Sequence, residues 1–118
     1  MIGSDVAAMA PPTGVFLVAR TVDGVVAGCG GVQSYVGDTA EIKRMWIDPA
    51  SRGAGVGRRL LGELEVRCRR LGYARVVLDT NATLVEAIAM YESAGYRPTE
   101  RYNDNPYAQR WFVKELAP

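Results

Sequence analysis

The sequence predicts a mixed α/β fold, in which a central β-sheet is flanked by helices. Segments rich in Val, Leu and aromatic residues alternate along the chain with two segments whose apolar residues recur at helical spacing. The 118 residues, 48% of them hydrophobic and 23% charged, suffice for one core and leave no room for two. We therefore expect a single domain over residues 1–118, in which residues 1–14 are irregular.

Three strands are predicted in the first part of the chain. Residues 15–21 and 25–32 flank the dipeptide Asp23-Gly24, which is typical of a hairpin turn, so we expect these two strands to be antiparallel. After a second turn, residues 40–48 form the third strand.

The first helix is predicted over residues 57–71, and Gly72 marks its end. Its buried face comprises Leu60, Leu61, Leu64, Cys68 and Leu71. A strand rich in Val and Leu follows at residues 74–79. Because strands joined through a helix usually lie parallel in one sheet, we expect the strands on either side of this helix to pair in parallel.

A second helix and two strands complete the predicted fold. Thr83 and Glu86 have the spacing of a capping box, so we expect the helix to open there and to end before Gly95. The remaining strands are residues 97–102 and 109–114, and a turn rich in Asn joins them.

A glycine-rich loop leads from the third strand directly into the first helix. The first turn of a helix has backbone N–H groups without helical partners and a partial positive charge, so it can donate several hydrogen bonds to a phosphate. Glycines let the backbone approach such a ligand closely, and arginines add charge. The loop residues with these properties are Arg52, Gly53, Gly55, Gly57 and Arg58. The sequence therefore predicts a site for a phosphate-bearing ligand.

The spacing of this loop excludes two common phosphate-binding motifs. A Walker loop requires Lys and then Ser or Thr after its last glycine, whereas Arg58 and Arg59 follow Gly57. A dinucleotide-binding loop requires a glycine three positions after Gly55, where Arg58 stands.

The loop resembles the pyrophosphate loop of the GNAT N-acetyltransferases, which hold acetyl-coenzyme A (acetyl-CoA). Arg52, Gly55 and Gly57 match the pattern (Arg/Gln)-x-x-Gly-x-(Gly/Ala), and residues 87–96 resemble a second segment of the family. The resemblance implies a GNAT-like acyl-CoA N-acyltransferase fold, with a mixed central sheet whose fourth and fifth strands splay apart. Family domains usually begin with a strand and one or two helices, so we expect an N-terminally shortened form of this fold.

The resemblance also implies a set of cofactor-binding residues. In the family, the pantetheine arm of the cofactor lies against the backbone of the fourth strand. The implied residues are Met45, Trp46 and Ile47 on that strand, and Arg52, Gly53, Ala54, Gly55, Val56, Gly57 and Arg58 in the loop and the first helical turn. Family members often have a cofactor-contacting Asn seven positions before a helical Tyr. Here that position is Leu84, and we expect Asn81 to reach the cofactor from the loop.

Two residues are candidates for catalysis. Acetyl transfer requires a base that takes a proton from the amine, and an acid helps the thiolate to leave. Tyr91 stands where the family often has that acid, and the alternative is a structural Tyr with its ring in the core. Glu41 stands where several family members have a base; a cross-strand ion pair and an anchor for the substrate amine are equally open alternatives. Asp79 is a second choice for the base.

We therefore expect an N-acetyltransferase that moves the acetyl group of acetyl-CoA to a primary amine by direct attack in a ternary complex. The alternative is a non-catalytic module that binds acyl-CoA or CoA, or an inactive truncated acetyltransferase. The acceptor stays open among small amines, amino acids, antibiotics and protein or peptide amines. Asn103, Tyr107 and Arg110 are candidate acceptor contacts, although a turn and an ordinary edge strand explain them equally well.

Composition argues against several other classes. The net charge is only +1 and no recognition helix or basic arm stands out, so we expect no nucleic-acid partner. The chain has no His, and Cys29 and Cys68 lack metal-ligand spacing, so we expect no metal and interpret both as buried thiols. Without a long apolar run or a signal peptide, we expect a cytoplasmic protein that does not bind membranes. The uncovered sheet edge of a shortened form favours pairing of two copies, so we expect a homodimer.

Overall fold

The computed structural model describes residues 8–116, and the expectation for residues 1–7 lies outside this range. The strands are β1 (Val15–Arg20), β2 (Val26–Val36), β3 (Thr39–Ile47), β4 (Arg75–Thr80), β5 (Arg97–Pro98) and β6 (Arg110–Glu115). The helices are α2 (Val56–Arg70) and α3 (Val85–Ser93), and a 3₁₀ turn, η1, spans Pro49–Ser51. Residues 9–13 form turns and a bend, and Met9 is buried.

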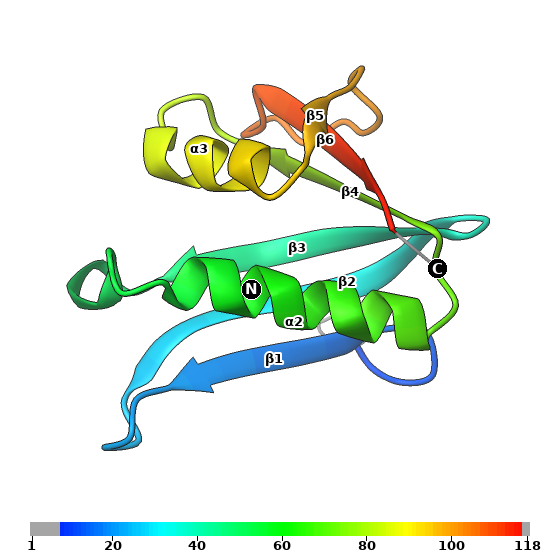
Figure 1. Ribbon diagram of the computed structural model, residues 1–118. Coiled ribbons are helices and arrows are strands. Elements are labelled where there is room, and N and C mark those ends of the chain that lie inside the picture. Colours follow the sequence, from blue (N-terminus) through cyan, green and yellow to red (C-terminus); the bar gives the residue numbers. More distant parts are fainter. Residues whose placement is uncertain (1–7, 117–118) are drawn as a thin grey trace.

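The sheet is mixed, with the strand order β1-β2-β3-β4-β6-β5. β3 and β4 are parallel, and every other neighbouring pair is antiparallel, which confirms the predicted mixed sheet and the predicted hairpin. α2 and α3 pack on one face of the sheet (Figure 1). The core between the layers joins Ile42, Leu78 and Phe112 of the sheet to Leu64 and Tyr91 of the helices.

β3 and β4 separate before either strand ends. Their register runs from Thr39 opposite Arg75 to Ile42 opposite Leu78, and no later residue of β3 pairs with β4. Figure 1 shows the two strands diverging towards η1 and α3. This separation confirms the splayed strands that the family resemblance implies, with β3 and β4 as the implied fourth and fifth strands.

A β-bulge in β3 accompanies the separation. Between positions 43 and 46, β3 has one residue more than the facing part of β2. Arg44 in this bulge has a φ of 58°, in the left-handed region that bulge residues can adopt. The extra residue shifts the side-chain alternation, so Met45 and Ile47 pack against the same core as Ile42. The sequence prediction of a regular strand did not include this bulge.

The helix ends follow the sequence closely, whereas the start of α3 does not. Gly72 and Gly95 adopt φ values of 93° and 97° just after the two helices, as a glycine stop requires. The predicted capping box is wrong: α3 begins at Val85, and the Thr83 hydroxyl donates to Asn81 Oδ1 at 2.7 Å. The Thr83 side chain is bonded to Asn81, and Leu84 takes the N-cap position, so no side chain caps α3. No helix within residues 8–116 is long and apolar enough to cross a membrane.

The strand expected over residues 97–102 is shorter than predicted. β5 has only two residues, and the backbone leaves the sheet after Thr99, whose N–H donates to Trp111 O at 2.8 Å. The reason is the pair Tyr102 and Asn103, whose side chains donate hydrogen bonds to a carboxylate on β3. Residues 99–109 therefore form a loop that reaches across from β5 to β3.

Candidate functional site

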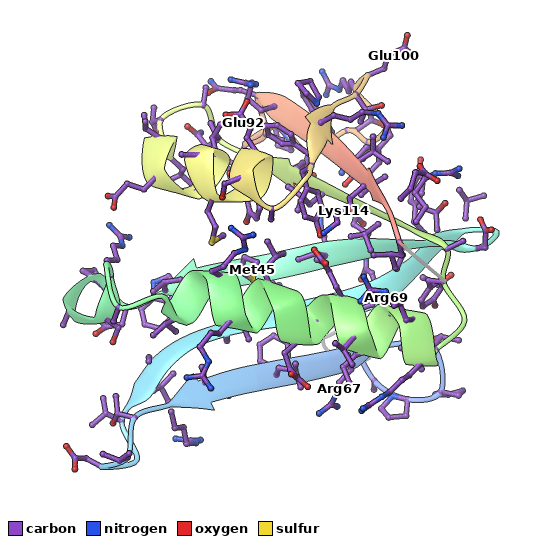
Figure 2. All side chains as sticks on the ribbon, in the orientation of Figure 1. Met45, Arg67, Arg69, Glu92, Glu100 and Lys114 are labelled. Atoms are coloured by element: carbon purple, nitrogen blue, oxygen red, sulfur yellow. The ribbon has the colours of Figure 1, made fainter. Side chains whose placement is uncertain are left out.

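A cleft of about 520 Å³ opens where β3 and β4 separate. Its first wall is the end of β3, its second is the glycine-rich loop with the first turn of α2, and its third is α3 with the loop before it. Figure 2 shows Met45 in the space between α2 and α3. The walls are made by Met45, Trp46 and Ile47; by Ser51, Arg52, Gly53, Gly55, Val56, Gly57 and Arg58; and by Thr83, Leu84, Val85, Glu86, Ala87, Met90 and Tyr91.

The glycine-rich loop forms the mouth of the cleft at the N-terminus of α2. Gly53 and Gly55 have φ values of 85° and 78°, which only glycine adopts freely. No side chain caps α2, and its first turn contains no acidic residue. Its first backbone bond runs from Arg59 N–H to Gly55 O, so the preceding N–H groups of the turn have no helical acceptor. The mouth therefore combines free backbone donors with the guanidinium of Arg52, which suits an anion.

Gly57 keeps the inside of the cleft open. A Cβ added at this position would lie 2.9 Å from Met90 Sδ and 3.4 Å from Ile47 Cγ1. Both neighbours line the cleft, so a side chain larger than a methyl group here would fill space that a ligand needs, and even a methyl group would press on Met90.

Arg58 spans the mouth from α2 to α3. Its Nη1 donates to Ser93 Oγ at 2.9 Å, and its Nη2 donates to Ser93 O at 3.4 Å. Because Ser93 is a neutral acceptor, a phosphate in the cleft would be the stronger partner for this guanidinium.

Tyr91 lines the cleft on the side of α3. Its side chain is buried, and its ring packs against Tyr96 and Phe112 at centroid distances of 5.9 and 6.2 Å. Burial, with a smaller contribution from the Asp79 carboxylate, raises the pKa of Tyr91 to about 12. At neutral pH the phenol therefore keeps its proton and can donate it. Tyr91 can pack in the core and also act as an acid, because its ring belongs to the core while the residue lines the cleft.

Glu41 is buried in a group of polar side chains, which we call the polar cluster. Its carboxylate accepts hydrogen bonds from Gln33 Nε2 at 3.0 Å, Tyr102 Oη at 2.7 Å and Asn103 Nδ2 at 3.2 Å. Lys43 Nζ lies 3.6 Å from the same carboxylate. Burial raises the pKa of Tyr102 well above its usual range, and the bond to Glu41 adds to this effect.

Asp79 at the end of β4 completes the polar cluster. It accepts hydrogen bonds from the side-chain amides of Asn103 and Asn105, and Lys43 Nζ lies 3.8 Å away. Asn103 also accepts a bond from Trp111 Nε1 at 3.0 Å. The amide of Asn103 thus joins Glu41, which is in the paired part of β3, to Asp79, which directly follows the last residue of β4 that pairs with β3. The cluster members are Gln33, Glu41, Lys43, Asp79, Tyr102, Asn103, Asn105 and Trp111.

The cleft brings together most of the predicted site residues. Met45, Trp46, Ile47, Arg52, Gly53, Gly55, Val56, Gly57, Arg58 and Tyr91 line it. Ala54 lines a separate groove between β1 and α2. Asn81 does not line the cleft: its amide donates to Tyr107 O at 3.1 Å and its carbonyl accepts from Thr83, so the side chain holds its own loop. Glu41 lies outside the cleft lining, in the polar cluster.

Sequence reasoning missed the wall that α3 contributes. This wall consists of Thr83, Leu84, Val85, Glu86, Ala87 and Met90. One signal could have found it, because Leu84 stands seven positions before Tyr91, where the family often has its cofactor-contacting Asn.

The candidate acceptor contacts divide in the structure. Asn103 is central to the polar cluster, whereas the Tyr107 side chain is 80% exposed. The Arg110 guanidinium lies over the Phe112 ring, 5.4 Å from its centroid.

Both thiols are free, and they differ in burial. Cys68 is buried and Cys29 only half-buried. Burial raises the pKa of Cys68 to about 12 and also raises that of Cys29, which makes both thiols poor nucleophiles at neutral pH. Among residues 8–116 there is no group of three or more Cys, Asp or Glu residues arranged to hold a metal ion.

Comparison with known proteins gives a family match over most of the chain. The sequence model of the Acetyltransferase (GNAT) family matches residues 5–96. An uncharacterized N-acetyltransferase of Schizosaccharomyces pombe is 41% identical over 97 residues, which cover 81% of this chain and 60% of that protein. The IAA acetyltransferase of Azospirillum brasilense is 38% identical over 93 residues, covering 78% of this chain and 60% of that protein. The chain spans about 60% of the length of these two relatives.

Solved structures share the fold. A GNAT-family acetyltransferase of Staphylococcus aureus superposes with a TM-score of 0.83 at 20% identity, covering 88% of this chain and 69% of the other. A Salmonella typhimurium protein, crystallised with its cofactor acetyl-CoA, superposes with a TM-score of 0.72 at 23% identity, covering 87% and 65%. The splayed sheet with its covering helices is thus shared with proteins of this family.

Proposed function

The chain belongs to the acetyltransferase (GNAT) family, and we propose that it transfers the acetyl group of acetyl-CoA to a primary amine by direct attack in a ternary complex. The observation that carries this proposal is the continuous cleft from the N-terminus of α2 to Tyr91. Its α2 wall has the chemistry to bind a pyrophosphate, and its α3 wall has a phenol that can act as an acid.

The residues present fit acetyl-CoA. Arg52 and the free N–H groups at the start of α2 suit its phosphates, and Gly57 leaves the space that an approaching ligand needs. Beyond Ile42, β3 has no partner strand on the side of β4, so the backbone of residues 45–47 is available to an extended, amide-bearing arm. Bound acetyl-CoA would supply a thioester that an amine can attack.

We assign Tyr91 the role of general acid. Two observations support this assignment: the raised pKa keeps the phenol protonated at neutral pH, and Tyr91 lines the cleft that the ligand would occupy. The phenol can then give its proton to a departing thiolate, a step worth about 10²-fold or more in rate.

For Glu41 we favour the anchoring role over that of a direct base. Three donors and the Lys43 ammonium already surround its carboxylate. With Asp79 and Lys43 it leaves the polar cluster one negative charge in excess, which favours an ammonium nearby and disfavours an anionic acceptor group. We propose that the proton of the amine leaves through water, and that the cluster attracts the amine.

Isothermal titration of acetyl-CoA into the chain tests the cofactor site. We expect micromolar binding that weakens about tenfold in Arg52→Ala, because the variant loses a charge-assisted phosphate contact. Arg59→Ala is the matched control, since Arg59 lines the groove beside β1 and not the cleft, and it should bind like the wild type. A folded chain that does not bind acetyl-CoA would contradict the proposal.

Acetyl transfer is then tested against a panel of amines, with mass spectrometry of the acetylated product as the readout. The panel should contain diamines and amino acids, including aspartate, because the chain is 38% identical over 94 residues to the N-acetylaspartate synthetase of Homo sapiens, covering 75% of this chain and 30% of that protein. The negative excess of the polar cluster leads us to expect diamines to react faster than aspartate. Binding of acetyl-CoA with no transfer to any amine would favour the alternative, a non-catalytic CoA-binding module.

A further inference from the structure

The cleft divides the fold into two halves that share few backbone bonds. The first half comprises β1, β2, β3 and α2, and the second comprises β4, β5, β6 and α3. Sheet pairing joins the halves only over the four register pairs from Thr39–Arg75 to Ile42–Leu78. From there to the mouth, the distance between the halves depends on side-chain contacts across the separation.

One such contact is a buried ionic group on the helix-covered face. The Glu65 side chain on α2 is 8% exposed. It accepts hydrogen bonds from Tyr96 Oη at 2.8 Å and from Lys114 Nζ at 2.9 Å. Lys114 extends from β6 towards α2 (Figure 2), and its ammonium also lies over the Tyr96 ring at 5.6 Å. Glu65 therefore bonds the first half of the fold to two residues of the second half.

Glu65 lies on α2 close to residues that line the cleft, so its bonds can affect the width of the cleft. The preceding residue, Leu64, packs over Gly30, where an added Cβ would lie 2.9 Å from Leu64 Cδ1 and 2.6 Å from Met45 Sδ. Glu65 thus lies level with the bulge, close to the point where β3 and β4 part. The Tyr96 ring in turn packs edge-on against Tyr91, which lines the cleft.

We propose that Glu65 is a positioning residue, which holds α2 at a fixed distance from the second half and so sets the width of the cleft for acetyl-CoA. The ligand part of this inference rests on the proposed function, whereas the distance between the halves does not. Glu65 touches no ligand in this proposal and acts through Tyr96 and Lys114.

A purely stabilising role makes a different prediction. Buried ion pairs often contribute little net stability, and replacing both partners by apolar residues of similar size is commonly neutral or stabilising. The double variant Glu65→Met with Lys114→Met therefore removes the tie without leaving a buried unpaired charge. If Glu65 only stabilised the core, this variant would keep the cleft as it is.

Two measurements on this double variant test the proposal. Spin labels at Gly62→Cys on α2 and Glu92→Cys on α3, in a Cys29→Ser background, report the distance between the halves without any ligand. Both labelled positions are exposed, and the remaining Cys68 is buried. We expect a longer or broader distance distribution, and acetyl-CoA affinity about tenfold weaker by titration. The midpoint of thermal unfolding should fall moderately, because the buried Tyr96 hydroxyl loses its acceptor.

The matched control is Glu63→Gln, which removes a carboxylate from the same helix. Among the described residues, the ion pair of Glu63 is with Arg67 one turn away on the same helix, so the distances and affinity of this variant should equal those of the wild type. An unchanged distance distribution in the double variant would overturn the proposal. If the double variant does not fold, Tyr96→Phe removes one of the two hydrogen bonds to Glu65 while keeping the ring, and it should also make the distance distribution longer or broader. If the wild type fails to bind acetyl-CoA, the proposed function fails, and the spin-label distances still decide the role of Glu65.

Discussion

The cleft and the polar cluster both lie close to the point where β3 and β4 separate, but they are assembled in different ways. Two walls of the cleft come from one continuous stretch, residues 45–58, whose turns and helix start follow from local sequence. The polar cluster instead draws on β2, β3, β4, β6 and the loop 99–109. The shape of the cleft therefore depends mainly on backbone geometry. The polar cluster depends on hydrogen bonds and ion pairs between side chains that are far apart in the sequence.

Two tyrosines illustrate this difference: Tyr91, which is buried, and Tyr102, which is half-buried. The Tyr102 hydroxyl donates to Glu41, whereas no hydrogen bond joins the Tyr91 hydroxyl to another described residue. Burial raises the pKa of both side chains. We infer that the Tyr91 hydroxyl is available to donate its proton in the reaction, whereas the Tyr102 hydroxyl uses its proton in a structural hydrogen bond to Glu41.

The largest expected effect is that of Tyr91→Phe on acetyl transfer. The variant keeps the ring packed against Tyr96 and Phe112 but loses the proton donor, so kcat should fall about 100-fold. Acetyl-CoA affinity and the unfolding midpoint should stay close to those of the wild type. Steady-state kinetics with the best amine of the panel give kcat, and an undiminished kcat would leave Tyr91 with a packing role only.

The raised pKa of Tyr91 also predicts a loss of stability at high pH. Between its ordinary pKa of 10 and its folded pKa of about 12, the unfolded chain loses this proton and the folded chain keeps it. The stabilisation present below pH 10 is therefore lost as the pH rises towards 12, by about 2–3 kcal/mol. Urea unfolding at pH 8, 10 and 11 should show a smaller loss in Tyr91→Phe than in the wild type. Cys68 titrates in both proteins and cancels from the difference, and identical losses would contradict the assignment.

The cleft was more predictable from the sequence than the cluster, for a physical reason. The glycines and the helix start of the loop leave local signals in the sequence, and these identified the mouth. Met45, Trp46 and Ile47 of the β3 wall were expected only through the family resemblance. The partners of Glu41 lie up to 62 positions away in the sequence. The sequence could not indicate them, because residues 99–102 were predicted as part of a strand and instead belong to the loop that contacts Glu41. The bulge at Arg44 was missed because a non-glycine residue with positive φ leaves no pattern in the sequence. Thr83 was misassigned as a helix cap because its hydroxyl bonds Asn81 instead, whereas the cofactor contact expected of Asn81 stays a prediction.

Tyr102→Phe should show the opposite profile to Tyr91→Phe. Loss of the Tyr102 hydroxyl leaves the buried Glu41 carboxylate without one of its donors, so the free energy of unfolding should fall by about 1–2 kcal/mol. Acetyl-CoA affinity should not change, because Tyr102 does not line the cleft. Chemical denaturation measures the loss, with Tyr107→Phe, an exposed tyrosine of the same loop, as the control that should be neutral. If both variants are equally stable, the hydrogen bond to Glu41 contributes nothing measurable.

The smallest expected effect compares two glycines of α2. Alanine at either position should favour the helix by roughly 0.5–1 kcal/mol, because it reduces the entropy lost on folding. At Gly62 an added Cβ meets open space, so Gly62→Ala should gain this stability and bind acetyl-CoA unchanged. At Gly57 the Cβ meets the flexible Met90 side chain inside the cleft, so Gly57→Ala should gain less stability and bind acetyl-CoA several-fold more weakly. Titration of the two variants reports the effect on acetyl-CoA binding, and thermal unfolding reports the effect on helix stability. Equal affinities would mean that Met90 moves aside without cost and that the backbone at Gly57 does not approach the ligand.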